Sequence, residues 1–318
     1  TAFTGLSGTF YPAVSTYSSA ANFGWKVNFG QRAFSHAAPS GYKALTVENL
    51  SDPTIADGSK YFDTKLWTGD GASTRTISNY GFSPDFIWIK NRTTAGWQHV
   101  LYDQIRGAGT GSVTKSLSTD STRTEASGND TNHGYLSGFT SDGFNLVKGS
   151  QGGGDYVNHN SWDYVGWAWD AGTSTVTNNN GTITSQVRAN QTAGFSICTY
   201  DGSGSNGTWG HGLLTAPDLV IVKCRNVAQN WAVQHSALGP TNYAYLQTTN
   251  AFRTSSGTAF WNDTAPTNTT VSVGTDNDTN SSGKTYVAYS FSTIPGYSSF
   301  GKYIGNGDAD GIFIYTGF

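Results

Sequence analysis

The sequence has no methionine, two cysteines, and a charged fraction of only 12% over its 318 residues. Its net charge is −3 and no run of lysine or arginine occurs, which argues against a nucleic-acid partner because such a partner requires a basic face. No apolar run reaches the length of a transmembrane helix, so membrane insertion is not expected. A signal peptide is also missing and the first residue is Thr1, so we expect a processed product or a piece of a longer chain.

The sequence is rich in glycine and aromatic residues instead. It contains 40 Gly, 10 Trp, 17 Tyr and 17 Phe. Each buried aromatic side chain removes roughly 150–250 Å² from water, so a chain with this composition can build large cores despite its many polar uncharged residues. Disordered chains have few aromatics and high net charge, so disorder is excluded. The length suits two or three domains.

Strand patterns dominate the sequence, and helical periodicity is nearly missing. Short runs of β-branched and aromatic residues recur between clusters of Gly, Asn, Asp and Ser. The clearest runs are Asp85–Lys90, Tyr164–Trp169, Asp218–Lys223 and Thr285–Phe291. The fold class predicted is therefore all-β, with tandem β-sandwich units of jelly-roll or lectin-like type.

An internal repeat determines the predicted organisation. The segment Gly81-Phe-Ser-Pro-Asp-Phe-Ile-Trp-Ile-Lys-Asn-Arg92 returns as Leu214-Thr-Ala-Pro-Asp-Leu-Val-Ile-Val-Lys-Cys-Arg225. Each copy is preceded by an aromatic strand and a glycine turn, followed by a second run with a Trp (Trp97 and Trp231), and closed by a Tyr-Val strand. We therefore predict repeat 1 at 57–174 and repeat 2 at 175–296. Residues 297–318 would begin a third repeat or form a strand-completing tail.

The two cysteines allow two interpretations. Cys198 and Cys224 flank predicted neighbouring strands, so a disulfide is compatible with the pattern. Two buried free thiols that act as small hydrophobic residues are the favoured interpretation, because two cysteines do not make a disulfide framework.

The N-terminal residues 1–56 do not match the repeats. They resemble the C-terminal part of a SPRY-type domain from large tail proteins of marine phages. The resemblance rests on Tyr11-Pro-Ala-Val14, Asn28-Phe-Gly-Gln-Arg-Ala-Phe34, Pro39-Ser-Gly-Tyr-Lys-Ala-Leu45 and Asn49-Leu50.

The remaining chain resembles the repeat domain that follows it in those phage proteins. The motifs carried by the first repeat are Gly81-Phe82, Pro84-Asp85, Ile89-Lys90, Tyr102-Asp103, Ser141-Asp-Gly-Phe144 and Tyr164-Val-Gly-Trp167. The second repeat keeps Pro217-Asp218, Val222-Lys223 and Tyr286-Val-Ala-Tyr289, and lacks the Tyr-Asp and Ser-Asp-Gly-Phe motifs. The resemblance implies a tail-fibre or adhesion protein of a virion, located on the virion surface or outside the cell, with no catalytic residues to carry over.

Catalytic and metal-binding patterns are weak. Glycoside hydrolysis needs two carboxylates at a defined separation, but the only glutamates are Glu48 and Glu125 in loop-like sequence, and the aspartates occur mainly in turns. The six histidines lack ligand spacing. The segment Asn306–Gly311 has alternating oxygen donors but no terminal Glu, so a turn is favoured over a calcium loop. We expect no enzyme, cofactor or metal.

A shallow sugar site is the binding function that the sequence supports. Such sites combine an aromatic platform with a few polar groups. Three tryptophans lie in loop-like sequence with polar neighbours. Six others lie in predicted strands and are expected in the core (Trp67, Trp88, Trp97, Trp167, Trp169 and Trp231). The candidate platform residues are Trp162, Trp209, Trp261, Asn160, Asn206 and His211, although packing is favoured over binding for the three tryptophans.

These patterns lead to one main hypothesis and two alternatives. The main one is a structural virion protein of a bacteriophage, part of a tail or surface fibre, that adheres to host glycans. Its expected partners are other copies of itself, as a trimer, and other virion proteins. The alternatives are a secreted or surface carbohydrate-binding module and a polysaccharide depolymerase.

Overall fold

The computed structural model describes residues 53–314 except 111–112, 126–129, 151–155, 255–258, 310 and 313, together with Arg32. The chain divides into the units Thr1–Asp52 and Pro53–Phe318. The predicted SPRY-like segment lies almost entirely outside the described residues, as does the segment 315–318. No helix in the described part is long and apolar enough to cross a membrane.

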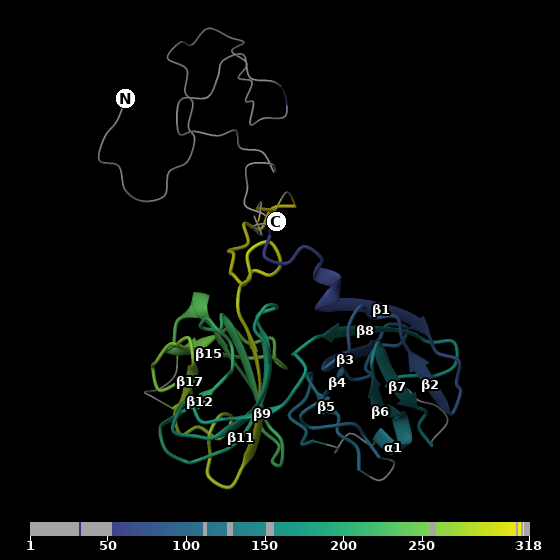
Figure 1. Ribbon diagram of the computed structural model, residues 1–318, viewed down its shortest axis with the longest axis horizontal. Helices are drawn as coiled ribbons and strands as arrows, with labels where there is room; N and C mark the ends of the chain where they lie inside the picture. The colour runs from purple at the N-terminus through teal and green to yellow at the C-terminus, as the bar shows by residue number, and fades with distance from the viewer. Residues whose placement is uncertain are drawn as a thin grey trace. The chain divides into compact units, whose positions relative to one another are not determined.

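The unit Pro53–Phe318 is built almost entirely from antiparallel strands, which confirms the predicted fold class of tandem β-sandwich units (Figure 1). We call strands β1 to β8 the first half and β9 to β18 the second half. The first half consists of η2 (Gly58–Lys60), β1 (Phe62–Thr68), β2 (Thr74–Ile77), β3 (Phe86–Asn91), β4 (Val100–Asp103), β5 (Leu117–Ser118), α1 (Asp130–His133), β6 (Tyr135–Thr140), β7 (Gly143–Val147) and β8 (Asp163–Trp169).

The second half follows with more strands. It consists of β9 (Val176–Asn178), β10 (Ser185–Asn190), β11 (Phe195–Asp201), β12 (Gly207–Gly210), β13 (Leu219–Cys224), β14 (Trp231–His235), η3 (Ser236–Leu238), β15 (Asn242–Tyr245), β16 (Arg253–Thr254), β17 (Thr270–Val273) and β18 (Thr285–Phe291). The four strongest sequence runs correspond to β3, β8, β13 and β18.

The two halves have the same order of strands. The large sheet runs β1-β8-β3-β4-β5 in the first half, and β11-β18-β13-β14-β15 occurs in the same sense in the second, extended by β10 and β9 on one side and β16 on the other. The small sheets repeat as well, since β2 pairs with β7 and β12 pairs with β17. The structure therefore repeats as the sequence does, whereas the residue boundaries 57–174 and 175–296 remain predictions.

Each half buries an aromatic core between its large and small sheet. In the first, Trp67 stacks on Tyr164 with ring centroids 5.6 Å apart. In the second, Tyr200 stacks on Tyr286 at 5.2 Å and on Trp209 at 5.3 Å. Such pairs stabilise a fold by about 0.5–1.5 kcal/mol beyond the apolar area they bury. Trp67 and Tyr200 hold the same place in the two sheets, as the sequence repeat predicted.

A third apolar cluster joins the two halves. It packs the outer face of one large sheet against that of the other. Phe86 of β3 lies at its centre, with ring centroids 4.6 Å from Tyr289 and 5.5 Å from Phe195. Because a sheet covered on both faces has no solvated side, its strands read as continuous apolar runs, which explains the unbroken runs in the sequence.

Polar links cross the same interface. Arg188 pairs with Asp85 at 2.7 Å, and Arg225 pairs with Glu125 at 2.6 Å. The indole Nε1 of Trp231 donates to the carbonyl of Ser118 at 2.8 Å. These bonds connect residues about a hundred positions apart in the chain and fix the two halves to each other.

Two sequence expectations need correction. Trp97 is not the counterpart of Trp231. Val100 and Ala232 hold the same register position, opposite Ile89 and Val222, so Trp231 corresponds to His99 and Trp97 lies outside β4. In addition, Trp88, Trp97, Trp167 and Trp169 are half-buried, whereas Trp67 and Trp231 are in the core as expected.

The two cysteines are both free and buried. Cys198 lies on β11 and Cys224 on β13, and β18 runs between these two strands. The strands are therefore not direct neighbours, and the favoured interpretation of two free thiols is confirmed.

Candidate functional site

The loop that precedes β8 is held rigidly at one end of the first half. Asn158 is fully buried, and its amide nitrogen donates to Asp70 Oδ1 at 2.8 Å and to the carbonyl of Ala72 at 3.2 Å. Gly69 passes so close that an added Cβ would lie 1.9 Å from the carbonyl oxygen of His159. The loop is thereby anchored to the turn between β1 and β2.

Five aromatic rings gather beside this loop. We call them the ring cluster, and its members are Trp97, His133, Tyr156, His159 and Trp162. His159 stacks on Trp162 with centroids 3.8 Å apart and an interplanar angle of 20°. Trp97 lies 6.1 Å from Trp162, 6.0 Å from Tyr156 and 5.1 Å from His133. All except Tyr156 are half-buried, so the cluster exposes ring surface to solvent.

Polar groups surround the ring cluster. Gln98 Oε1 accepts hydrogen bonds from the Tyr156 hydroxyl at 3.2 Å and from Arg123 at 2.8 Å. Burial raises the pKa of Tyr156, so its hydroxyl keeps the proton that it donates. Asn160 is exposed, and its backbone oxygen lies 2.9 Å from the Nδ1 of His159. Exposed rings with nearby amide and guanidinium donors are the composition of a shallow binding site for a polar ring compound.

The second half contains the same scaffold. Asn280 is fully buried and accepts from the backbone of Ser203 as Asn158 does from Asp70. The backbone N–H of Ser281 donates to the Tyr286 hydroxyl at 2.8 Å, and that of His159 donates to the Tyr164 hydroxyl at 3.0 Å. Ser281 is therefore the counterpart of His159.

Other backbone bonds identify the remaining counterparts. Gly69 donates to the carbonyl of Trp162, and Gly202 donates to that of Lys284. Lys90 donates to the carbonyl of Trp97, and Lys223 donates to that of Gln229 at 2.9 Å. Tyr156 and Asp278 each lie two residues before the buried Asn.

Polar side chains thus replace the rings in the second half. Lys284, Ser281, Gln229 and Asp278 stand where the first half has Trp162, His159, Trp97 and Tyr156. With its amide oriented to satisfy both neighbours, Gln229 donates to Asp278 at 3.0 Å and accepts from Lys284 at 3.1 Å. The scaffold does not require aromatic residues at these positions, so the rings of the first half are a local specialisation.

The residues predicted as platform fall into two groups. Trp162 and Asn160 lie together at the ring cluster. The other four lie in the second half. Trp209 and His211 are fully buried and Trp261 is 1% exposed, so these three candidates do not form an exposed platform, and the two tryptophans have the packing role that was favoured for them. Trp209 is part of β12 and packs on Tyr200, although its Gly-rich neighbours suggested a loop.

Asn206 is exposed and donates to the amide oxygen of Asn262 at 2.8 Å. Trp261, which precedes Asn262 in the sequence, is in the core, so no exposed ring of the predicted set accompanies Asn206. Sequence reasoning missed Trp97, which was expected in the core, and His133 and His159, for which the spacing of the histidines indicated no ligand role. Of the two histidines, only His159 had a signal in the sequence, because it lies three residues before Trp162.

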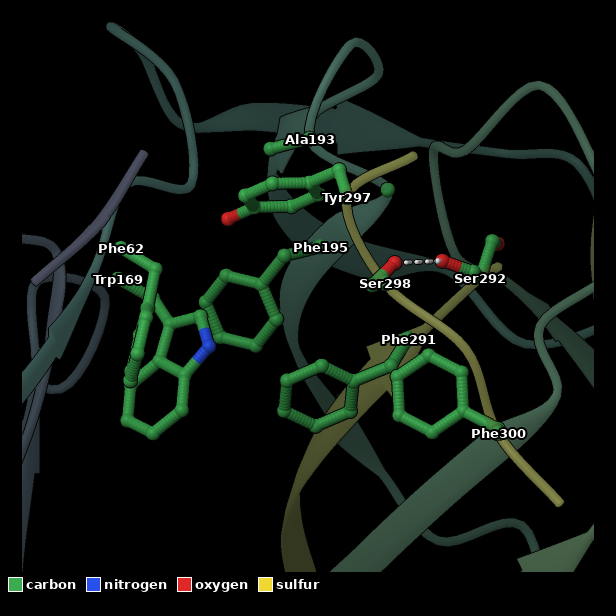
Figure 2. A pocket seen from close by; sticks show the side chains of 10 residues that line it. Phe62, Trp169, Ala193, Phe195, Phe291, Ser292, Tyr297, Ser298 and Phe300 are labelled. Carbon is green, nitrogen blue, oxygen red and sulfur yellow. Dashed lines mark hydrogen bonds between the residues drawn. The ribbon is translucent and has the colours of Figure 1, made fainter. Parts of the chain in front are cut away.

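A separate apolar cleft lies between the halves (Figure 2). Phe62 and Trp169 of the first half face Phe195 and Phe291 of the second, and Tyr297 and Phe300 flank them. Its volume is about 160 Å³, and a neighbouring apolar hollow of about 260 Å³ shares Trp169, Phe291 and Phe300 with it. The only side-chain hydroxyls in the lining of the cleft belong to Ser292, Tyr297 and Ser298.

The carboxylates that stand out are engaged in ion pairs or buried. Burial opposes ionisation of Glu125, but its bonds to Arg225 and the charge of Arg106 lower its pKa below the usual value. Burial raises the pKa of Asp85 to about 7 although Arg188 acts in the opposite direction. Both groups link the halves, and neither lines the ring cluster or the cleft. Glu48 lies outside the described residues.

Comparison with known proteins gives one match. The model of a family described as a domain of unknown function (DUF7483) matches residues 57–318. No curated protein and no solved structure matches. Since the match covers the larger part of the sequence, including both sandwich halves, the chain belongs to the DUF7483 family.

Proposed function

We propose that this chain is a non-enzymatic structural protein of a bacteriophage virion, in a tail or surface fibre, and that the ring cluster binds a host glycan. The virion assignment is supported by the resemblance of residues 1–56 and of the repeat motifs to phage tail proteins. The tandem sandwich fold suits it, because rigid β units in series make extended structures.

The observation that carries the glycan proposal is the contrast between the two halves. One scaffold bears half-exposed rings in the first half and an amide, a carboxylate and an ammonium in the second. Sugar rings present apolar C–H faces that pack on aromatic rings, while their hydroxyls need nearby hydrogen-bond partners. Trp97 and Trp162 supply such rings, and Asn160 and Gln98 supply such partners.

The direct test is a glycan array probed with the whole chain and with Trp97→Ala and Trp162→Ala. Loss of one stacking ring should cost about 1.5 kcal/mol of binding free energy and therefore weaken binding about tenfold. Trp167→Ala is the matched control, because Trp167 is also half-buried but lies on β8, in a T-shaped pair with Trp88. Equal effects of all three variants, or no glycan bound by the native chain, would refute the site.

The virion assignment needs its own measurement. Antibody labelling of phage particles in the electron microscope should place the chain on a periodic appendage, and sedimentation should show self-association, for which we predict a trimer. Glycan binding without particle association would favour a secreted carbohydrate-binding module. Release of reducing ends from a host polysaccharide would favour the depolymerase alternative.

A further inference from the structure

One arginine side chain lies beside the ring cluster, and a second arginine belongs to a segment that is hydrogen-bonded to the loop of Trp162. The exposed Arg123 donates to Gln98 Oε1 at 2.8 Å and also bonds the Tyr156 hydroxyl. The exposed Arg92 directly follows β3, and its backbone N–H donates to the carbonyl of Asp163, the residue after Trp162. The guanidinium of Arg123 therefore lies at the ring cluster, while Arg92 is tied to it through the backbone only.

Neither arginine forms an ion pair with a carboxylate among the described residues. Asp120 and Glu125 are the acidic side chains closest to Arg123 in sequence, and Glu125 pairs with Arg225 at 2.6 Å. The carboxylate of Asp163, whose backbone carbonyl accepts from Arg92, accepts from the Thr68 hydroxyl at 2.7 Å. In the second half the counterpart of Arg92 is Arg225, and Glu125 pairs with it at 2.6 Å. The same repeat position thus forms an ion pair in the second half and none among the described residues of the first half.

We propose that the ring cluster recognises an acidic sugar, a uronic or sialic acid, whose carboxylate pairs with Arg123. This inference rests on the proposed glycan function. A guanidinium binds a carboxylate through two parallel hydrogen bonds, which fix the orientation of the sugar as well as its affinity. Arg123 has Gln98 and Tyr156 as neutral hydrogen-bond partners, so its guanidinium is positioned without an ion pair to any carboxylate of the described residues.

The experiment compares hexuronate oligosaccharides with the same oligosaccharides after carboxyl reduction, measured by titration calorimetry on the whole chain. We expect the acidic form to bind at least about tenfold more tightly, as charged hydrogen bonds do. The difference should shrink as salt is raised from 50 to 500 mM, because exposed charges are screened.

Arg123→Gln should remove this preference and leave the affinity for the reduced form unchanged. Arg253→Gln is the matched control, because Arg253 is an exposed arginine of β16 in the second half. Equal binding of both sugars by the native chain overturns the acidic-sugar inference but leaves the glycan proposal intact. Binding of neither sugar, with no hit on the glycan array, overturns both.

Discussion

The two halves of the unit share the same strand order and equivalent aromatic stacks, yet their residues differ at three equivalent positions. The loop before the last strand bears rings in the first half and polar groups in the second. The Pro-Asp motif places Asp85 in a buried ion pair and leaves Asp218 half-buried. The strand β4, which pairs with β3, ends on Asp103, whereas its counterpart β14, which pairs with β13, ends on His235. The comparison separates what the fold needs from what each copy adds.

The largest expected difference is between Asp103 and His235. Both side chains accept from a backbone N–H shortly after the strand, that of Arg106 at 2.9 Å and that of Ala237 at 3.1 Å. Asp103 is in addition fully buried, pairs with Arg106 at 2.5 Å and accepts from the Tyr289 hydroxyl of the other half at 2.7 Å.

Asp103→Ala should therefore lower the free energy of unfolding by about 3–5 kcal/mol, because it leaves the buried Arg106 charge with only the more distant Glu125, at 3.8 Å, as a carboxylate partner. His235→Ala should cost only about 0.5–1 kcal/mol, the range of a lost cap. Urea unfolding of both variants measures the difference. Similar losses would show that Asp103 is no more than a cap.

The next difference is a pH dependence of opposite sign at the two Pro-Asp motifs. Burial raises the pKa of Asp85 to about 7 from its usual 3.8. The folded state then binds this proton more tightly than the unfolded state, so stability falls as pH rises from about 4 to 7. For Asp218, burial is outweighed by bonds from Thr293 and Ser236, which lower its pKa. Its contribution is present above pH 4 and is lost as pH falls.

Asp85→Asn should therefore reduce the loss of stability between pH 5 and pH 8 by about 1–3 kcal/mol, following 1.36 kcal/mol per unit of pKa. Asp218→Asn is the paired variant and should instead remove stability at pH 8 and less at pH 3. Thermal unfolding across this pH range gives both curves. Parallel curves for the two variants would contradict the opposite environments of the two aspartates.

The sequence predicted the fold more completely than the candidate site. The strands β3, β8, β13 and β18 are unbroken apolar runs, and because such runs have few other interpretations, they and their repetition predicted tandem sandwiches. The ring cluster assembles residues from three separate segments, around Trp97, His133 and Trp162. Only the folded chain brings these together, so local pattern placed Trp97 in the core.

Burial at turns was equally hard to foresee. Trp209 and Trp261 stand beside Asn and Gly, and such neighbours usually indicate a surface loop. Here β12 is a short strand of the small sheet, so Trp209 points inward, and Trp261 joins the same core. A short edge strand gives too few residues for its alternation to be read, whereas the long central strands do not have this problem.

The smallest effect on stability should come from exchanging the loop residues between the halves. Trp162→Lys introduces the residue that the second half has at the same position, where the scaffold accepts it. The side chain of Trp162 is half-buried, so the free energy of unfolding should fall by no more than about 1 kcal/mol, while glycan binding weakens about tenfold or more.

The reverse change, Lys284→Trp, should add no glycan binding, because Ser281 and Gln229 offer no ring for the new indole to stack on. Chemical denaturation and calorimetry on this reciprocal pair test whether the second half is a bare scaffold. Binding gained by Lys284→Trp would show that one tryptophan suffices, and the contrast between the two loops would then lose its meaning as a marker of function.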